Sequence, residues 1–262
     1  MPLDRFDLFD AHLHIIDPRF PLVPNHGFVP EPFTVDQYRQ RLNHARLVGG
    51  AVVSGSFQGF DQTYLVDALR RLGPGFVGVT QLPATASDTL LLRLHRAGVR
   101  ALRFNLQRGG SAGVRDLDRM ARRVHELVGW HVELYADAAD LAELLPTLIE
   151  LPAVSVDHLG LSLRGLPTLL RLVHFGVRVK ATGFGRVDFD VRGALRKLVN
   201  VNPDAVLFGT DLPSTRAPRA YDDADIALIV DTLGEADAAR VLCGNAQQWY
   251  RRCERVVEIP CA

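Results

Sequence analysis

The chain has 262 residues, of which 47% are hydrophobic and 23% are charged, and this balance predicts a globular protein rather than a coiled coil, a collagen or a disordered chain. Lysine and arginine number 30 together, as do aspartate and glutamate, so the chain has no net charge that would hold nucleic acid or an anionic membrane. We therefore expect no nucleic-acid or membrane partner, and any anionic ligand must be bound by local groups.

The sequence also predicts a cytoplasmic location. Its first residues lack a basic region followed by an apolar run, so we expect no secretory signal. No apolar stretch reaches the roughly 18 to 20 residues that span a bilayer. The three cysteines, at positions 243, 253 and 261, have a spacing that suits neither a disulfide framework nor a zinc ribbon, which agrees with a reducing compartment.

Short apolar runs rich in β-branched residues alternate along the chain with amphipathic stretches of helical length. We predict strands at residues 7–12, 50–56, 76–82, 99–106, 131–136, 153–158, 177–182 and 205–210. We predict a helix that begins after Thr34, further helices at residues 61–72, 87–97, 114–128, 138–148, 166–174 and 191–199, and two or three closing helices from Tyr221 onward. Gly98 and Gly176 stand just before strands, as glycines at helix ends do.

Strands that alternate with helices predict parallel pairing, and eight such units in a chain of this length predict a closed (β/α)8 barrel of the TIM type. A doubly wound sheet would usually carry a glycine-rich turn after its first strand, where this chain has Asp10-Ala-His-Leu-His. No linker divides the sequence, so we expect one barrel domain over residues 1–262. The loop at residues 15–33, which contains five prolines, is expected to fold over the barrel mouth.

In such barrels the chemistry lies where strands end, so the last residues of each predicted strand are the candidates. Strand one ends with His12 and His14, which stand two residues apart, so their side chains share one face. Asp211 follows strand eight and is a candidate proton acceptor or metal ligand. Strand six ends in Asp157 and His158, of which alternation turns only one inward, and the position at the strand end favours His158.

Strand alternation predicts that two cationic side chains point into the barrel. Arg103 in strand four must be paired, because an unpaired buried charge is costly. It is either an ion-pair partner of Asp211 or Glu133, or a fork that binds a carboxylate of a ligand. Lys180 in strand seven is expected to pair with a buried acid.

Three further residues stand near the expected mouth of the barrel. Arg108 lies just beyond strand four and is either a ligand contact or a solvated loop residue. Arg186 lies in a glycine-flexible loop of the kind that reaches a ligand. Tyr135 ends strand five, where it either donates its hydroxyl to an anionic ligand or packs as a core tyrosine.

Five segments together resemble the amidohydrolase superfamily. They are Asp10-Ala-His-Leu-His, Leu102-Arg-Phe-Asn, Val156-Asp-His-Leu-Gly, Val179-Lys-Ala-Thr-Gly and Phe208-Gly-Thr-Asp-Leu-Pro. The resemblance covers nearly the whole chain in the right order. It is closer to the lactonase branch, which is typified by 2-pyrone-4,6-dicarboxylate lactonase and 4-sulfomuconolactone hydrolase, and it implies the same barrel fold.

The resemblance also implies roles for single residues. It implies an aspartate that activates the hydrolytic water, histidines that surround the ester to be cleaved, and arginines with a neighbouring tyrosine that bind substrate carboxylates. The matching positions are Asp211 for the base, His12, His14 and His158 for the ester, and Arg103, Arg108, Arg186 and Tyr135 for the carboxylates.

The ligands of the metal-dependent members are incomplete here. Binuclear members of the superfamily need a carboxylated lysine or an acid at strand four and a histidine at strand five, where this chain has Arg103 and Tyr135. His12, His14 and Asp211 remain as three ligands for a zinc ion that would carry a water in its fourth position. Because Arg103 is a cation near the same point, we expect metal-independent chemistry and no cofactor, with zinc as the alternative.

We therefore expect a hydrolase that opens a small anionic lactone in aromatic or sugar-acid catabolism. One alternative is a zinc-dependent decarboxylase of the same superfamily, against which the missing strand-five histidine counts. Another alternative is a barrel that binds a dicarboxylate without catalysis, although a scaffold has no need for so many inward polar groups. The sequence names neither the lactone nor the oligomeric state.

Overall fold

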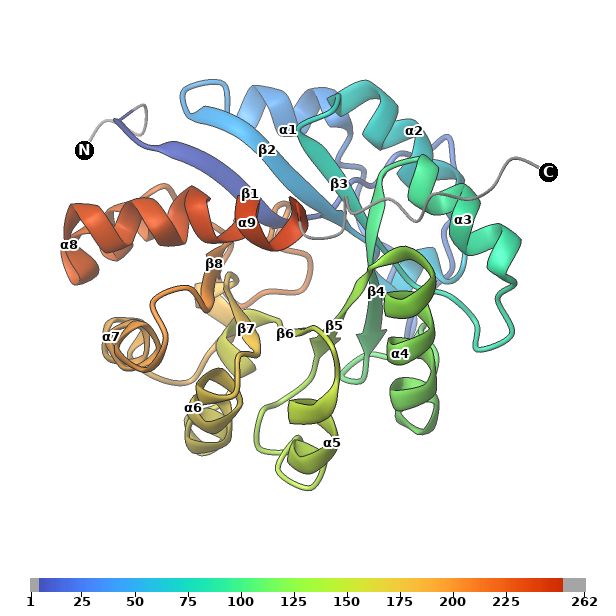
Figure 1. Cartoon of the computed structure of the whole chain (residues 1–262). Helices are drawn as coiled ribbons and strands as arrows, with labels where there is room; N and C mark the ends of the chain where they lie inside the picture. The colour runs from blue at the N-terminus through green and yellow to red at the C-terminus, as the bar shows by residue number, and fades with distance from the viewer. Residues whose placement is uncertain (1–4, 252–262) are drawn as a thin grey trace.

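In the computed structural model, which describes residues 5–251, eight parallel strands follow one another in chain order around one sheet (Figure 1). They are β1 (Asp7–Leu13), β2 (Arg46–Val53), β3 (Phe76–Thr80), β4 (Val99–Asn105), β5 (His131–Tyr135), β6 (Val154–Val156), β7 (Arg178–Ala181) and β8 (Val206–Phe208). Helices connect consecutive strands, as crossovers between parallel strands require. The predicted (β/α)8 barrel is confirmed.

The helices surround the barrel and close one end of it (Figure 1). They are α1 (Val35–Arg41), α2 (Thr63–Leu72), α3 (Asp88–Arg96), α4 (Leu117–Val128), α5 (Leu145–Glu150), α6 (Leu166–His174), α7 (Val191–Val201), α8 (Ala224–Ala239) and α9 (Asn245–Arg251). Thr34 caps α1 as predicted, because its side chain accepts a hydrogen bond from the backbone N–H of Gln37. The predicted closing helices are α8 and α9. Cys253 and Cys261, which the sequence interpretation leaves without a disulfide or zinc role, lie outside the described residues.

Two predicted elements have different bounds in the structure. Helix α5 begins only at Leu145, because Pro146 fits the first turn of a helix and cannot stand inside the helix predicted at residues 138–148. Strand β2 starts at Arg46, earlier than the predicted residue 50. The strand passes through Gly49, and only a glycine fits at this position because a Cβ atom there would lie 2.2 Å from the carbonyl oxygen of Gly75.

The barrel closes between β1 and the segment that follows β8. The carboxylate of Asp10 accepts hydrogen bonds from the backbone N–H and the hydroxyl of Thr210, at 2.8 and 2.7 Å. The backbone N–H of Asp211 donates to the carbonyl of His12 at 2.7 Å. Gly209 allows this approach, because a Cβ there would lie 2.7 Å from the Cβ of His12. These contacts hold Asp211 beside the histidines of β1.

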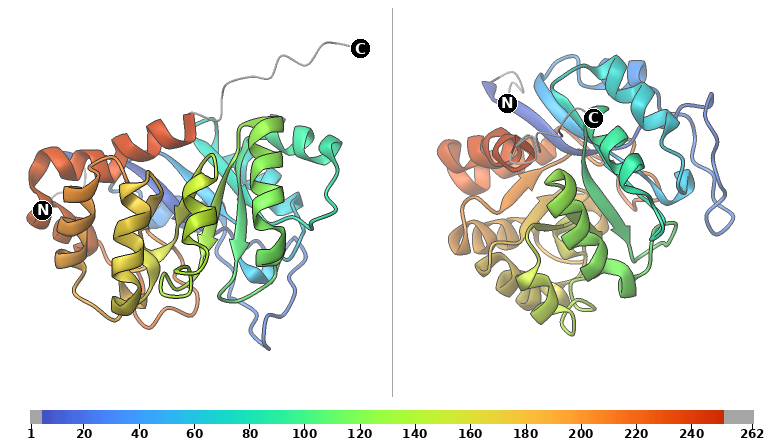
Figure 2. Two further views of the ribbon diagram at one scale, coloured as in Figure 1. Left: turned by 60° about the horizontal axis from the view of Figure 1, so that its bottom comes forward. Right: turned by 45° about the vertical axis from the view of Figure 1, so that its right-hand side comes forward.

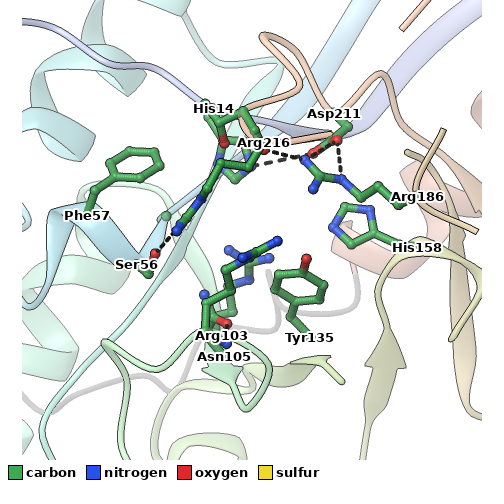
Figure 3. Close-up of a pocket in the computed structure, with 13 residues that line it drawn as sticks. His14, Ser56, Phe57, Arg103, Asn105, Tyr135, His158, Arg186, Asp211 and Arg216 are labelled. Atoms are coloured by element: carbon green, nitrogen blue, oxygen red, sulfur yellow. Dashed lines mark hydrogen bonds and ion pairs between the residues drawn. The ribbon is translucent and has the colours of Figure 1, made fainter. Parts of the chain in front are cut away.

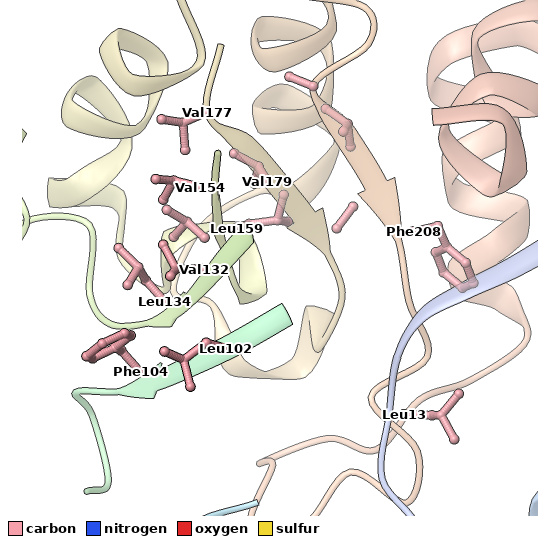
Figure 4. Packing of buried hydrophobic residues seen from close by; sticks show 14 of the residues in the cluster. Leu13, Leu102, Phe104, Val132, Leu134, Val154, Leu159, Val177, Val179 and Phe208 are labelled. Atoms are coloured by element: carbon pink, nitrogen blue, oxygen red, sulfur yellow. The ribbon is translucent and has the colours of Figure 1, made fainter. Parts of the chain in front are cut away.

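Alternation along the strands separates the two faces of the sheet. Outward residues such as Leu102, Phe104 and Leu134 pack against the helices in the main apolar core (Figure 4). Inward residues of β4 are therefore Ala101, Arg103 and Asn105. The inner face has a smaller apolar cluster at the amino-terminal end of the barrel, which Trp249 and Tyr250 of α9 complete.

The proline-rich loop after β1 extends beyond the carboxyl ends of the strands (Figure 2). Its residue Asn25 donates a side-chain hydrogen bond to the carbonyl of Arg108 at 3.1 Å, so the loop reaches the barrel mouth as expected. Among residues 5–251, no helix has the length and apolar character that a membrane crossing requires.

Candidate active site

A pocket with about 310 Å³ of empty space, part of it open to solvent, lies at the carboxyl ends of the strands (Figure 3). It is lined by His14, Gly55, Ser56, Phe57, Arg103, Asn105, Arg108, Tyr135, His158, Arg186, Asp211, Thr215 and Arg216. Seven of the eight predicted site residues are among them. The eighth, His12, is fully buried beneath the pocket between Asp211 and Asp157.

Asp211 is held at the base of the pocket in a left-handed backbone conformation, with φ of 62°. Its Oδ2 atom accepts a hydrogen bond from Nε of Arg186 at 2.7 Å. Its Oδ1 atom has no hydrogen-bond partner and lies 3.6 Å from Nε2 of His14 and 3.9 Å from Nε2 of His12. Burial raises the pKa of Asp211, but Arg186 and the imidazoles outweigh it, so the net pKa lies well below its usual value. Asp211 is therefore an ionised carboxylate with one free oxygen.

Three imidazoles surround that oxygen. The ring of His12 lies 5.1 Å from that of His14 and 4.9 Å from that of His158, between centroids. Burial lowers the pKa of His12 to about 4 and lowers the pKa of His158 well below its usual value, so both rings are neutral at neutral pH. Nδ1 of His14 lies 2.7 Å from the carbonyl oxygen of Val53 and must donate to it, because a carbonyl can only accept.

The end of β6 differs from its prediction. The strand ends at Val156, Asp157 is still extended, and His158 begins a turn with φ of 50°. Alternation from the outward residues Val154 and Val156 carries Asp157 inward, and the turn at His158 brings the next side chain into the barrel as well. The expectation that only one of the pair faces inward is wrong, and Asp157 is a site residue that this reasoning missed.

Arg103 is paired, but with a different acid from those predicted. Its Nη2 and Nε atoms lie 2.9 and 3.3 Å from Oδ2 of Asp157, and Nη1 donates to the carbonyl of Ser54 at 2.6 Å. The predicted partners Asp211 and Glu133 are wrong, because Asp157, which points inward at the end of β6, places a nearer carboxylate at Arg103. One edge of the guanidinium is therefore already occupied, and only its remaining N–H groups are available to a ligand in the pocket.

A buried charge cluster continues from Arg103 down the barrel, and we call it the inner network. It comprises Arg103, Asp157, Lys180 and Glu133. Nζ of Lys180 pairs with Glu133 and lies 3.9 Å from Oδ1 of Asp157, which confirms the predicted pairing of Lys180 with a buried acid. Asp157 also faces Nδ1 of His12 at 3.5 Å. Asp157 therefore links the inner network to His12 and holds Arg103 in place.

Tyr135, Arg186 and Arg108 occupy different parts of the pocket wall. The ring of Tyr135 packs under the guanidinium of Arg103 at 5.3 Å and against His158 at 4.8 Å, and its hydroxyl points into the pocket (Figure 3). Arg186 is engaged by Asp211 and by the carbonyl of Thr215. Arg108 also lines the pocket, and no ion pair with a carboxylate is found for it among residues 5–251.

Sequence reasoning missed Arg216. It follows Asp211 by five residues in the loop after β8, and its guanidinium donates to Ser56 at 3.0 Å and to the side chain of Asn25 at 3.1 Å. The rule that loops after barrel strands carry function would have included it, but nothing in the sequence showed that this arginine turns back over the pocket. Ser56 and Thr215 were missed for the same reason, whereas Asn105, which ends β4 with an inward side chain, could have been included by alternation.

The residues present can hold one divalent cation, in a set that differs from the predicted one. His12, His158 and Asp211 each offer a ligand atom, and the three atoms lie within 4.8 Å of one another. Both nitrogens of His12, Nδ1 of His158 and Oδ1 of Asp211 have no hydrogen-bond partner, as open ligands would. His14 was predicted as the third ligand, but the turn at His158 brings that imidazole into the set instead. The donor set suits zinc, with water in a fourth position.

Comparison with known proteins gives consistent similarities. The amidohydrolase family model matches residues 9–252. A 2-pyrone-4,6-dicarboxylate hydrolase from Comamonas testosteroni is 32% identical over 251 residues, which cover 85% of this chain and 81% of the relative. A 4-sulfomuconolactone hydrolase from Rhizobium radiobacter is 28% identical over 249 residues, which cover 85% and 82%. The structure of a probable 2-pyrone-4,6-dicarboxylic acid hydrolase from Acinetobacter baumannii shares the fold, with a TM-score of 0.79 at 21% identity and coverage of 93% and 98%.

Proposed function

The chain belongs to the amidohydrolase family, and on that premise we propose that it hydrolyses a small lactone bearing carboxylates, with water activated by Asp211 and without a metal ion. Relatives that align with most of the chain are named as hydrolases of such lactones. The arginine-lined pocket supports an anionic substrate. Lactones of this kind arise when aromatic acids or sugar acids are broken down, and we place the reaction in such catabolism.

The observation that carries the proposal is the free Oδ1 atom of Asp211. It is buried, ionised and without a hydrogen-bond donor, and it faces the imidazoles of His12 and His14. A water molecule beside it would find one strong acceptor and neighbouring imidazoles. This is the arrangement that a general base needs, because the base must lie within hydrogen-bond reach of the proton that it removes.

The reaction then proceeds by acyl transfer to water. Asp211 takes a proton as the water oxygen forms a bond to the lactone carbonyl carbon. The bond from that carbon to the ring oxygen breaks, and the ring oxygen receives the proton from Asp211. The product is a hydroxy acid whose new carboxyl group ionises and releases one proton at neutral pH.

His158 is the imidazole best placed to stabilise the oxyanion. It lines the pocket, it is neutral, and its Nδ1 has no partner, so the ring can turn a nitrogen to the ligand. His12 is buried below the pocket, and one nitrogen of His14 is already bonded to the carbonyl of Val53. Removing one donor to an oxyanion costs about 2.7–4 kcal/mol of the barrier.

Zinc is the alternative to metal-independent chemistry. His12, His158 and Asp211 would hold the ion, which when bound would lower the pKa of a water molecule and polarise the carbonyl. In either case Asp211 remains the carboxylate beside the attacking oxygen. The pairing of Asp211 with Arg186 supports the metal-independent proposal, because the cation already compensates the carboxylate charge.

The test is a hydrolysis screen of carboxylated lactones, beginning with 2-pyrone-4,6-dicarboxylate, with protein dialysed against a chelator and with untreated protein. We expect ring opening with release of one proton per turnover and equal rates for both samples. Activity that disappears after chelation and returns with zinc would overturn the metal-independent mechanism. Carbon dioxide release without ring opening would identify a decarboxylase. Binding without turnover over the whole panel would identify a non-catalytic barrel.

A further inference from the structure

The ring of His12 lies between two buried carboxylates. Its backbone is fixed on both sides, because its N–H donates to Asp10 at 3.2 Å and its carbonyl accepts from the N–H of Asp211 at 2.7 Å. Its Nδ1 atom lies 3.5 Å from Oδ1 of Asp157, and its Nε2 atom lies 3.9 Å from Oδ1 of Asp211. A neutral imidazole has one N–H and one lone pair, so only one of the two carboxylates can face the proton of His12.

The two carboxylates differ in what else can reach them. Within residues 5–251, Oδ1 of Asp157 has no hydrogen-bond partner, and the nearby ammonium of Lys180 is already paired with Glu133. Asp157 is not among the described residues that line the pocket, whereas Asp211 is, so water can donate to the free oxygen of Asp211. Because a buried acceptor without a donor is costly, the N–H of His12 belongs on the Asp157 side. The distance of 3.5 Å exceeds that of an ordinary hydrogen bond, but a carboxylate still attracts the N–H and repels the lone pair.

The lone pair of His12 then lies on Nε2 and faces Oδ1 of Asp211. Two acceptors 3.9 Å apart cannot bond to one another, but one water molecule can donate to both. A water oxygen roughly 2.8 Å from each atom makes an angle of about 90° between them, close to the angle between its own O–H bonds. Both O–H bonds of such a water are engaged, and the lone pairs of its oxygen point away from the two acceptors, toward the pocket.

We propose that Asp157 is a positioning residue, which holds the proton of His12 on Nδ1 and thereby keeps Nε2 as an acceptor that, together with Asp211, orients the water molecule for attack. The proposal rests on the proposed function for the attacking water, whereas the place of the proton on His12 is independent of it. A zinc ion would also need an unprotonated Nε2, so the same tautomer suits either mechanism.

The variant Asp157→Asn should reverse the tautomer. Arg103 donates to Oδ2 of the carboxylate at 2.9 Å, so the oxygen of the new amide should turn to Arg103 and its N–H groups to Nδ1 of His12. Nδ1 must then accept, and the proton moves to Nε2, where it faces the free oxygen of Asp211 and competes with the water. We expect kcat to fall about 10- to 100-fold, the range for loss of an outer carboxylate that orients a histidine.

Nitrogen-15 NMR of the histidine rings measures the tautomer directly, because a nitrogen that carries a proton differs in chemical shift from one with a lone pair. Spectra are recorded on the full chain after dialysis against a chelator, so that no metal ion fixes the tautomer, and the His12 signals are assigned by their loss in His12→Gln. Asp225→Asn is the matched control, because it removes a buried carboxylate that accepts from Arg219 and from the backbone of Asp222. We expect the proton on Nδ1 in the wild type and the control, and on Nε2 in Asp157→Asn.

Several outcomes would overturn the proposal. A wild-type spectrum with the proton of His12 on Nε2 does so even where Asp157→Asn fails to fold. An unchanged tautomer in Asp157→Asn with a native circular dichroism spectrum also does so, as does an equal change in Asp225→Asn. A reversed tautomer with normal kcat on the lactone found in the hydrolysis screen would overturn the orientation of the water. The expected tautomers without hydrolysis of any lactone would overturn the proposed function and leave the assignment of the His12 proton standing.

Discussion

The inner network and the two arginines at the pocket mouth, Arg108 and Arg216, which we call the rim pair, place their cations in opposite electrostatic situations. In the inner network, Arg103 and Lys180 lie against Asp157 and Glu133, and all four side chains are buried. At the rim, Arg108 and Arg216 are half-buried and have no carboxylate partner within residues 5–251. The comparison teaches that the chain neutralises the cations buried inside the barrel and leaves two arginines at the pocket mouth without a carboxylate partner.

Burial explains the difference. An unpaired charge deep in the barrel would lose its hydration with no compensation, so each cation there requires an acid. Water at the pocket mouth solvates an arginine that has no acid, at modest cost. The inner network should therefore respond to mutation through stability and pH, and the rim pair through ligand affinity.

The largest effect is expected at Asp211, where the inner groups meet the pocket. Asp211→Asn removes the proposed general base, and turnover should fall about 10²- to 10⁴-fold while the circular dichroism spectrum is unchanged. Kinetic assays on the lactone found in the hydrolysis screen measure the change. A variant with normal kcat would show that another group activates the water.

Asp157→Asn should have the largest effect on stability. It leaves Arg103 without its buried partner and Lys180 with one acid fewer, and the free energy of unfolding should fall by about 3–5 kcal/mol in urea titrations. Asp118→Asn is the matched control, because it breaks the exposed pair with Arg122 and should cost less than about 1 kcal/mol. Equal losses in both variants would contradict the distinction between buried and exposed pairs.

The lowered pKa of Glu133 should make the stability of the protein depend on pH. Burial raises its pKa, but Lys180 and His131 outweigh this and bring it to about 2, below the ordinary 4.5. The unfolded chain therefore binds the proton first, and the stabilisation present above pH 4.5 is lost as the pH falls toward 2.

Between pH 4.5 and 3, the unfolding free energy of the wild type should fall more steeply than that of Glu133→Gln. The difference in slope should approach about 1.4 kcal/mol per pH unit, the value for one proton. Urea titrations at several pH values measure both slopes. Parallel slopes would show that Glu133 keeps an ordinary pKa in the folded protein.

The smallest effect is expected at the rim. Arg108→Gln should raise KM for a doubly charged lactone about tenfold, because one charge-assisted contact is lost, and kcat should change little. Its unfolding free energy should stay within about 0.5 kcal/mol of the wild type, since no pair is broken. A stability loss as large as that of Asp157→Asn would place Arg108 with the inner network.

The sequence determined the barrel and most of the pocket. Eight apolar runs separated by helices admit few topologies, and the carboxyl ends of parallel strands must meet at one face, so His14, Arg103 and Asp211 could be placed together without coordinates. The motifs identified the family for the same reason, because they stand at these strand ends.

Only the tertiary structure decided the pairings. Strand periodicity fails where a strand ends, so the inward turn at His158, and with it the third possible metal ligand, could not be read from alternation. Asp157 obeys alternation, but which inward acid meets Arg103 depends on distances between strands. Arg216 likewise reaches the pocket because contacts with Asn25, Ser56 and Phe28, distant in the chain, hold a strained turn. Local patterns fix which element a residue occupies, whereas charge partners depend on distances between elements, which packing alone sets.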